Sequence, residues 1–300
     1  MTATPMAPRT PVRHATQEIS YAWSARSKGA RVLIRAMENA TGRIGLIRRA
    51  RGYEHDIAQG ADFWQVMAER YGLQIDVTRG ALSNIPKTGP LVLIANHPYG
   101  ILDGLIMGLL LSRIRGDFRI LAHNVFKRAE EIDRIILPVD FSETKEAMKA
   151  NLRTRSDALR YLGDGGAIGV FPGGTVSTAA KPFGAPMDPG WRNFTAKMIA
   201  KSDATVVPVF FEGHNSRLFQ LASHLHYSLR MGLMIREFKR HANRPVRLCV
   251  GEPIPQAELD AVRESPKQMM DFLRRATYDL SPTPLKSYGY GFEFEAKYRN

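Results

Sequence analysis

Short apolar runs alternate along most of the chain with longer segments in which apolar and polar positions recur at helical spacing. The apolar runs predict strands over residues 91–95, 118–122, 135–141, 167–171, 205–211 and 246–250. The amphipathic segments predict helices over residues 61–71, 101–114, 125–133, 143–162, 191–202, 216–240 and 265–280. Strands alternating with helices indicate an α/β sandwich, with a largely parallel sheet flanked by helices. Such sheets bind ligands beyond the carboxyl ends of their strands.

The beginning of the chain follows a different pattern, so we divide the protein into an N-terminal segment, residues 1–60, and a main domain, residues 61–300. Three prolines within residues 1–15 indicate a loose tail. Residues 17–51 mix apolar side chains with many arginines and predict a basic amphipathic helical segment. The pattern of this segment is interrupted near Gly42.

The net charge of the chain indicates which class of partner it binds. The 42 Lys and Arg residues outnumber the 29 Asp and Glu residues, which gives a formal net charge of +13 and a pI near 10.0. This balance favours an anionic partner such as a membrane surface, a nucleic acid or a phosphorylated substrate. No nucleic-acid-binding motif accompanies the charge, so the sequence does not favour a nucleic acid. The basic N-terminal helices either lie in an anionic membrane interface or pack on the main domain with a solvated basic face.

The absence of a signal-peptide pattern and of a membrane-spanning segment indicates the cellular compartment of the protein. The N-terminus has no apolar core of signal-peptide length. The most apolar helical segment, residues 101–114, is shorter than the roughly 20 residues that span a bilayer. The single cysteine, Cys249, cannot form an internal disulfide and fits a reducing compartment. We therefore expect a protein that is cytosolic or attached peripherally to a membrane.

The stretch LVLIANHPYGILDG contains the first candidate site. It places Asn96 and His97 at the end of a predicted strand and Asp103 at the start of the next helix. Positions six apart on a continuous helix point about 120° away from each other, so only a turn brings the two side chains together. Pro98 and Gly100 favour such a turn. The histidine is either an incidental part of the turn or a general base held by an orienting carboxylate.

Gly100, Gly104 and Gly108 recur at four-residue intervals along one face of the predicted helix. A glycine inside a helix costs about 1 kcal/mol relative to alanine. Close packing against the sheet, or space for a substrate chain, would explain this pattern, and we expect packing.

The stretch GAIGVFPGGTVST is the second candidate, because a predicted strand runs directly into a glycine turn. Consecutive glycines allow backbone N–H groups to point at an anion, either a phosphate or the oxyanion of acyl transfer. The candidate binding residues here are Pro172, Gly173, Gly174, Thr175 and Ser177.

The stretch VVPVFFEGHNSRLF again places polar residues directly after a strand. Asn215, Ser216 and Arg217 either contact a substrate or belong to the start of the following helix, where the first two would act as caps. His224 and His226 form an H-x-H pair with no obvious third ligand, so no metal site is expected.

Together these blocks resemble the glycerolipid acyltransferase superfamily. Its members carry N-H-x-x-x-x-D after a strand, then F-P-E-G-T-R-S, then a V-P-V strand, and this chain has NHPYGILD, FPGGTVS and VVPVFF in the same order. The chain is most similar to a bacterial subgroup with N-H-P-x-G-x-x-D-G, which also tends to carry a G-x-N-S block. The resemblance covers roughly residues 75–255.

The resemblance implies a mixed sheet with helices on both sides and peripheral attachment at the cytoplasmic face of the inner membrane. It implies that His97 is the base and Asp103 its partner. A lysolipid hydroxyl would then attack the thioester of acyl-CoA or acyl carrier protein directly, without a cofactor or a covalent acyl-enzyme. Asn96 and Gly100 belong to the same motif, and Asp140 matches an acidic residue of the family; we expect all three to contact substrate.

The chain also departs from the common family pattern. Gly173 replaces a glutamate, Val176 replaces an arginine, and Phe141 replaces an arginine associated with the phosphate of the acceptor. These departures favour a lysolipid with a different head group. They also leave open a non-catalytic basic lipid-binding protein that has kept the fold.

Overall fold

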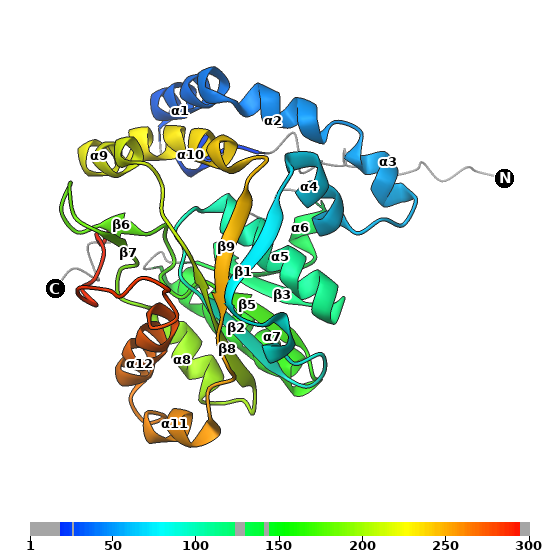
Figure 1. Cartoon of the computed structure of the whole chain (residues 1–300), viewed down its shortest axis with the longest axis vertical. Helices are drawn as coiled ribbons and strands as arrows, with labels where there is room; N and C mark the ends of the chain where they lie inside the picture. Colours follow the sequence, from blue (N-terminus) through cyan, green and yellow to red (C-terminus); the bar gives the residue numbers. More distant parts are fainter. Residues whose placement is uncertain (1–18, 26, 124–129, 141–143, 295–300) are drawn as a thin grey trace.

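The computed structural model describes residues 19–25, 27–123, 130–140 and 144–294, and its centre is a seven-stranded sheet (Figure 1). The strands are β1 (Gln74–Gly80), β2 (Leu91–Ala95), β3 (Arg119–His123), β4 (Ile136–Val139), β5 (Ala167–Val170), β8 (Thr205–Phe211) and β9 (Pro245–Val250). Their order is β1-β9-β8-β2-β5-β3-β4. Neighbouring strands run parallel, except that β8 and β9 run antiparallel. The expected mixed, largely parallel sheet is confirmed.

The central strand β2 is buried along its whole length because its side chains enter two different cores. Leu91 and Leu93 belong to the core on one face of the sheet, whereas Val92 and Ile94 belong to the core on the other. A strand covered on both faces needs a continuous apolar run rather than an alternating one. This is why the apolar runs predicted the bounds of β2 and β8 correctly.

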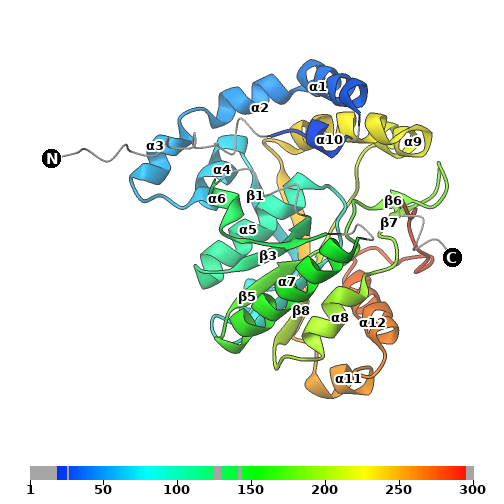
Figure 2. The same cartoon turned by 180° about the vertical axis from the view of Figure 1, so that it is seen from behind.

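Helices cover both faces of the sheet (Figures 1 and 2). The first face packs against α4 (Phe63–Tyr71), α5 (Ile101–Arg115) and α10 (Tyr227–His241). The second face packs against α7 (Lys145–Gly163), α8 (Asn193–Ile199), α11 (Gln256–Ala261) and α12 (Pro266–Tyr278).

The N-terminal segment forms an outer layer on the first face. It contains the 3-10 turn η1 (Ala22–Ser24) and the helices α1 (Lys28–Thr41), α2 (Arg43–Ala50) and α3 (Tyr53–Ala58). Gly42, with φ 146°, separates α1 from α2 where the sequence pattern is interrupted. Helix α1 packs along α10, and both views show the two helices side by side. The predicted helical segment is thus confirmed in its helical character but divided into separate elements.

The prediction of one helix over residues 216–240 is wrong. The chain forms α9 (Arg217–Leu225) and then α10, and His226 between them has an extended backbone with φ −162° and ψ 139°. The Nδ1 atom of His226 accepts a hydrogen bond from the N–H of Ser228 at 3.1 Å. This side-chain cap starts a second helix, which the amphipathic pattern alone does not reveal.

Several elements were not predicted from the sequence. They are β1, α3, α11, the 3-10 turn η2 (Leu82–Asn84) and the hairpin of β6 (Thr178–Ala179) and β7 (Pro186–Met187). Strand β1 lies at the edge of the sheet and has no fully buried residue, so its sequence lacks an apolar run.

Some predictions concern residues outside the described ranges. The loose tail over residues 1–15 and the residue Phe141 lie outside them. Of the helix predicted over residues 125–133, only α6 (Glu130–Asp133) is described. The boundary at residue 60 stays a prediction. Within the described residues, no helix combines the length and the apolar character needed to cross a membrane.

Candidate active site

The three polar blocks of the sequence follow three neighbouring strands. Strand β2 lies between β5 and β8 and runs parallel to both. His97 follows β2, Gly173 follows β5, and Asn215 follows β8. Because parallel strands place their carboxyl ends at one edge of a sheet, the fold gathers three blocks that are far apart in the sequence.

His97 and Asp103 are in contact. The Nδ1 atom of His97 lies 2.9 Å from Oδ2 of Asp103. The Asp103 side chain is fully buried, whereas the imidazole keeps 18% of its side-chain surface exposed. The imidazole also stacks on the ring of Phe171, with 4.3 Å between centroids and 26° between planes. With Nδ1 facing the carboxylate, Nε2 is the ring nitrogen left to exchange a proton with a ligand.

The first turn of α5 brings these two side chains together. Oδ2 of Asp103 accepts hydrogen bonds from the backbone N–H groups of Tyr99, at 2.7 Å, and Gly100, at 2.9 Å. Gly100 has φ 86°, and a Cβ added there would lie 2.3 Å from Cε of Met234. Burial raises the pKa of Asp103, while the contact with His97 and the two amides act against this rise. One carboxylate therefore caps the helix and holds the imidazole.

The loop after β5 lies directly against His97. The N–H of Ser177 donates a hydrogen bond to the carbonyl oxygen of His97 at 2.8 Å. The N–H of Gly174 closes the turn on the carbonyl of Phe171 at 3.0 Å. Of the predicted residues in this loop, Ser177 contacts His97 directly, and the others belong to the same loop: Pro172, Gly173, Gly174 and Thr175.

Asp188 connects the two loops and was not found by the sequence analysis. Its Oδ1 accepts hydrogen bonds from the N–H of His97, at 3.2 Å, and from Oγ of Ser177, at 2.5 Å. Its Oδ2 accepts one from Nε1 of Trp191 at 2.9 Å. The side chain is fully buried. Asp188 lies in the stretch PMDPGW, which matches no motif, so only the tertiary structure identifies it.

Arg230 of α10 is a second residue that the sequence analysis missed. It is only 1% exposed, and burial lowers its pKa to about 9. No carboxylate in the described part of the chain forms an ion pair with this guanidinium. Its four acceptors are all neutral oxygens: Oγ1 of Thr178, Oγ of Ser223, Oγ1 of Thr175 and the carbonyl of Val176. Arg230 therefore fixes the segment that follows the glycine turn.

Asn96 joins the end of β2 to the end of β8. Its side-chain amide donates a hydrogen bond to the carbonyl of Phe211 at 2.9 Å and accepts one from the N–H of the same residue at 2.7 Å. Both ends of the amide are thus bonded to the backbone of Phe211. Contact with substrate stays a prediction for Asn96.

The loop after β8 contains the other predicted residues. Asn215 is fully buried, and its side-chain amide has no hydrogen-bond partner among the described residues. Ser216 caps α9, and its Oγ lies 2.7 Å from Oε1 of Glu237. Arg217 donates to the carbonyl of Gly184 at 2.8 Å. Ser216 is the helix cap that the sequence allowed, whereas Asn215 is not.

Asp140 does not lie with the other candidates. It follows β4, which is separated from β2 by β3 and β5. Strands lie about 4.8 Å apart, so this separation is roughly 14 Å along the same edge of the sheet. The backbone of Asp140 is held by the side-chain amide of Asn151.

The histidine pair of the sequence has structural contacts. Nε2 of His224 lies 3.0 Å from the carbonyl oxygen of Ala179, and His226 caps α10. Within the described ranges, no three His, Cys, Asp or Glu side chains form a group that could hold a metal ion.

The arrangement around His97 favours proton removal from a bound hydroxyl. A buried carboxylate holds the imidazole, and the glycine turn lies beside it. Ser177 is the hydroxyl residue next to His97 in the loop, but its Oγ is bonded to Asp188. In this geometry Ser177 is held in place by Asp188 and is not activated as a nucleophile. The site therefore favours transfer of a group straight to a bound alcohol, without an intermediate on Ser177.

Comparison with known proteins gave matches to a family model, to named relatives and to a solved structure. A family model described as acyltransferase matches residues 61–284. A lyso-glycine lipid O-acyltransferase of Phocaeicola vulgatus is 23% identical over 228 residues, which cover 74% of this chain and 78% of the relative. A protein of the same name from Bacteroides thetaiotaomicron is 25% identical over 230 residues, covering 74% and 80%. The crystal structure of the 1-acyl-sn-glycerophosphate acyltransferase PlsC from Thermotoga maritima has a TM-score of 0.46 and 16% identity, covering 88% of this chain and 87% of that one.

Proposed function

Because this chain belongs to the acyltransferase family, we propose that it transfers a fatty acyl group from a thioester to the hydroxyl group of a lysolipid. The contact between His97 and Asp103 carries the proposal, since it provides a histidine base with its orienting carboxylate. Acyl-CoA and acyl carrier protein are the two donors to compare, because both present the acyl group as a thioester.

The reaction follows from the roles of these two residues. Nε2 of His97 takes the proton of the acceptor hydroxyl as its oxygen attacks the thioester carbonyl carbon. Asp103 stabilises the imidazolium that forms. When the tetrahedral intermediate collapses, the carbon–sulfur bond breaks, and the leaving thiolate takes the proton from His97. The products are an ester and a free thiol, and no acyl-enzyme is formed.

The glycine turn is suited to the negative charge of the intermediate. It lies beside His97, and its backbone N–H groups are the donors that an oxyanion requires. We assign this role to the N–H of Gly173, because the N–H of Gly174 already donates to the carbonyl of Phe171. A side chain at position 173 would crowd the turn, since a Cβ added there would lie 3.3 Å from Cβ of Asp188.

We propose a lyso-aminolipid as the acceptor, with a lyso-glycine lipid as the first to test. Two observations support this choice. The two named relatives act on lyso-glycine lipid according to their names. In addition, Val176 occupies the position of an arginine in the common family motif. The carbonyl of Val176 accepts a hydrogen bond from Arg230, whose four acceptors are all neutral oxygens.

We also propose that the outer face of α1 attaches the protein to an anionic membrane surface. The inner face packs on the domain through Ile34, which is fully buried. On the outer face Val32 is 69% exposed and Leu33 is 46% exposed. The adjacent basic residues include Lys28 and Arg31. A helix with exposed apolar side chains next to basic ones is suited to the interface of an anionic bilayer.

The decisive experiment uses the purified protein with lyso-glycine lipid and either palmitoyl-CoA or palmitoyl acyl carrier protein. The wild type is expected to release thiol and form the diacylated lipid with at least one donor. His97→Ala is expected to abolish both products while its melting temperature stays near that of the wild type. Binding to vesicles without thiol release, across a panel of lysolipids and donors, would show a non-catalytic lipid-binding protein instead.

A further inference from the structure

We propose that Asp188 is a positioning residue for acyl transfer: it fixes the backbone of His97 and the loop of the glycine turn in one geometry. The inference rests on the proposed function of His97. It concerns a residue outside the sequence motifs, 91 positions along the chain from His97.

His97 is held through both of its backbone groups. Its N–H donates to Oδ1 of Asp188 at 3.2 Å, and its carbonyl accepts from the N–H of Ser177 at 2.8 Å. The Oγ of Ser177 donates to the same Oδ1 at 2.5 Å. These three hydrogen bonds close a ring through three residues, so the loop after β2 cannot shift without the loop after β5. The base and the glycine turn therefore keep a fixed separation.

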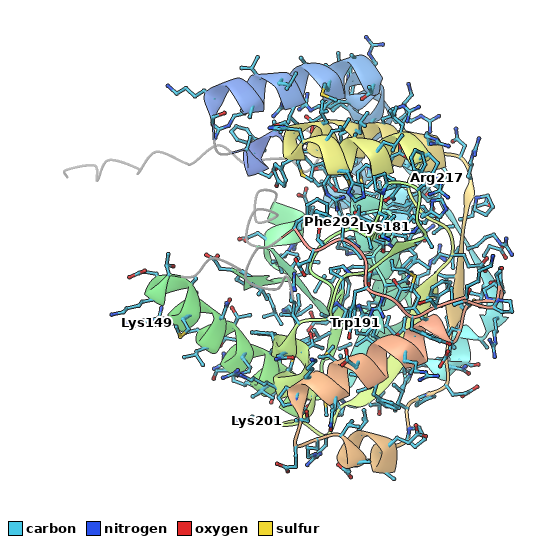
Figure 3. The ribbon with its side chains drawn as sticks, turned by 90° about the vertical axis from the view of Figure 1, so that its left-hand side faces the viewer. Lys149, Lys181, Trp191, Lys201, Arg217 and Phe292 are labelled. Atoms are coloured by element: carbon cyan, nitrogen blue, oxygen red, sulfur yellow. The ribbon has the colours of Figure 1, made fainter. Side chains whose placement is uncertain are left out.

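Asp188 is itself anchored from the other side. Its N–H donates to the hydroxyl oxygen of Tyr278 at 2.8 Å. Its carbonyl accepts hydrogen bonds from Gly291, at 2.8 Å, and from Nη2 of Arg274, at 3.1 Å. In Figure 3 the C-terminal segment with Phe292 runs between the layer of α9 and α10 and the helix α12. The backbone of Asp188 thus belongs to a rigid frame, while its side chain reaches the catalytic loops.

The chemistry of this position requires a carboxylate. One oxygen faces the backbone N–H of His97 and the other faces the indole N–H of Trp191. Both groups are donors that cannot accept a hydrogen bond. An asparagine side chain has a single oxygen, so in either orientation its NH₂ group faces an N–H group. One of the two contacts is then lost, even though the size of the side chain is unchanged.

Asp188→Asn tests this directly. We expect kcat to fall about 10- to 100-fold, because misplacement of about 1 Å can cost that much, while KM for both substrates changes less than about threefold. The Trp191→Phe change removes the opposing donor and allows the asparagine oxygen to face His97. The Asp188→Asn/Trp191→Phe double variant is therefore expected to regain about tenfold in kcat over Asp188→Asn alone. Asp157→Asn, which removes an exposed carboxylate of α7, is the matched control and should keep the wild-type rate.

Hydrogen–deuterium exchange of the His97 amide separates this proposal from the proposed function. The amide is expected to exchange at least about tenfold faster in Asp188→Asn than in the wild type and in Asp157→Asn. If His97→Ala keeps its turnover, the function assigned to His97 is wrong, and the exchange result still decides whether Asp188 holds the loop. Wild-type kcat in a folded Asp188→Asn variant, unchanged exchange, or no recovery in the double variant would each overturn the role of Asp188.

Discussion

Oδ2 of Asp103 serves both the imidazole of His97 and the amino end of α5. The same oxygen lies 2.9 Å from Nδ1 of His97 and accepts the N–H groups of Tyr99 and Gly100. The orientation of the imidazole is therefore coupled to the first turn of a helix that is packed in the core. Two properties of Asp103 therefore matter for the imidazole, the charge on the carboxylate and the shape of the turn, and separate substitutions can test each of them.

Asp103→Asn removes the charge and keeps an oxygen for the two amides. We expect kcat to fall about 10²- to 10⁴-fold, because the imidazolium loses its stabilising carboxylate. Burial raises the pKa of Asp103, so loss of the charge relieves a cost to the folded state, whereas the new NH₂ group takes the place of Oδ1, which has no hydrogen-bond partner among the described residues; we therefore expect only a small change in the melting temperature. Steady-state kinetics together with thermal unfolding check both statements. A folded variant with an unchanged rate would contradict the pairing.

Gly100→Ala disturbs the shape of the turn and keeps the charge. The added Cβ would lie 2.3 Å from Cε of Met234 and 3.0 Å from the hydroxyl of Tyr21, at a position with φ 86°. We expect a loss of about 2 kcal/mol or more in the free energy of unfolding, together with a lower kcat. Gly104→Ala on the same helix is the matched control, because a Cβ there meets nothing within 4 Å. It should stabilise the protein by about 0.5–1 kcal/mol in urea unfolding; equal losses in both variants would rule out this explanation.

His241 should make the fold sensitive to acid. Its ring lies 4.3 Å from that of Tyr99, and burial lowers its pKa below 6.5, with Glu237 acting in the opposite direction. The unfolded chain then binds the proton more readily than the folded protein, so stability falls as the pH drops below about 6.5 toward the lowered pKa. His241→Phe keeps an aromatic ring beside Tyr99 but cannot titrate. Its melting temperature should decrease less than that of the wild type between about pH 7 and pH 5. Parallel decreases would exclude His241 as the cause.

The outer face of α1 gives a test of membrane attachment. The Val32→Ser/Leu33→Ser double variant should lower the amount of protein that sediments with anionic vesicles by roughly tenfold, since full burial of one aliphatic side chain is worth about 1.5–3 kcal/mol. The control is Met148→Ser/Leu152→Ser, which changes two exposed apolar residues of α7. Equal losses in both pairs would locate the attachment elsewhere or show that it is not specific to α1.

The sequence predicts the parts of this fold in which a local pattern reports burial. The run LVLIA has the bounds of β2 because that strand faces two cores, and the turn that joins His97 to Asp103 could be predicted from Pro98 and Gly100. Strand β1 could not be predicted in this way, since it is an edge strand without a fully buried residue. The break at His226 also escapes the pattern, because the amphipathic periodicity continues through it.

The sequence analysis missed two residues of the site for a different reason. Asp188 and Arg230 contact the loops after β2 and β5 through hydrogen bonds between residues distant in the sequence, and neither has a motif around it. Both residues become part of the site only because folding brings the loops after β2 and β5 next to them. A single sequence contains no signal for such contacts, whereas the His97 loop carries its signal in neighbouring residues.

The hydrogen bond from Gly291 to the carbonyl of Asp188 has a consequence for biosynthesis. The ribosome synthesises the chain from its N-terminus, so His97 emerges long before the segment around Gly291 that completes the frame around Asp188. Until that segment has left the exit tunnel, the nascent protein can form much of its sheet but cannot lock the loops after β2 and β5. Competence for acyl transfer should therefore arise only after Gly291 has emerged from the ribosome.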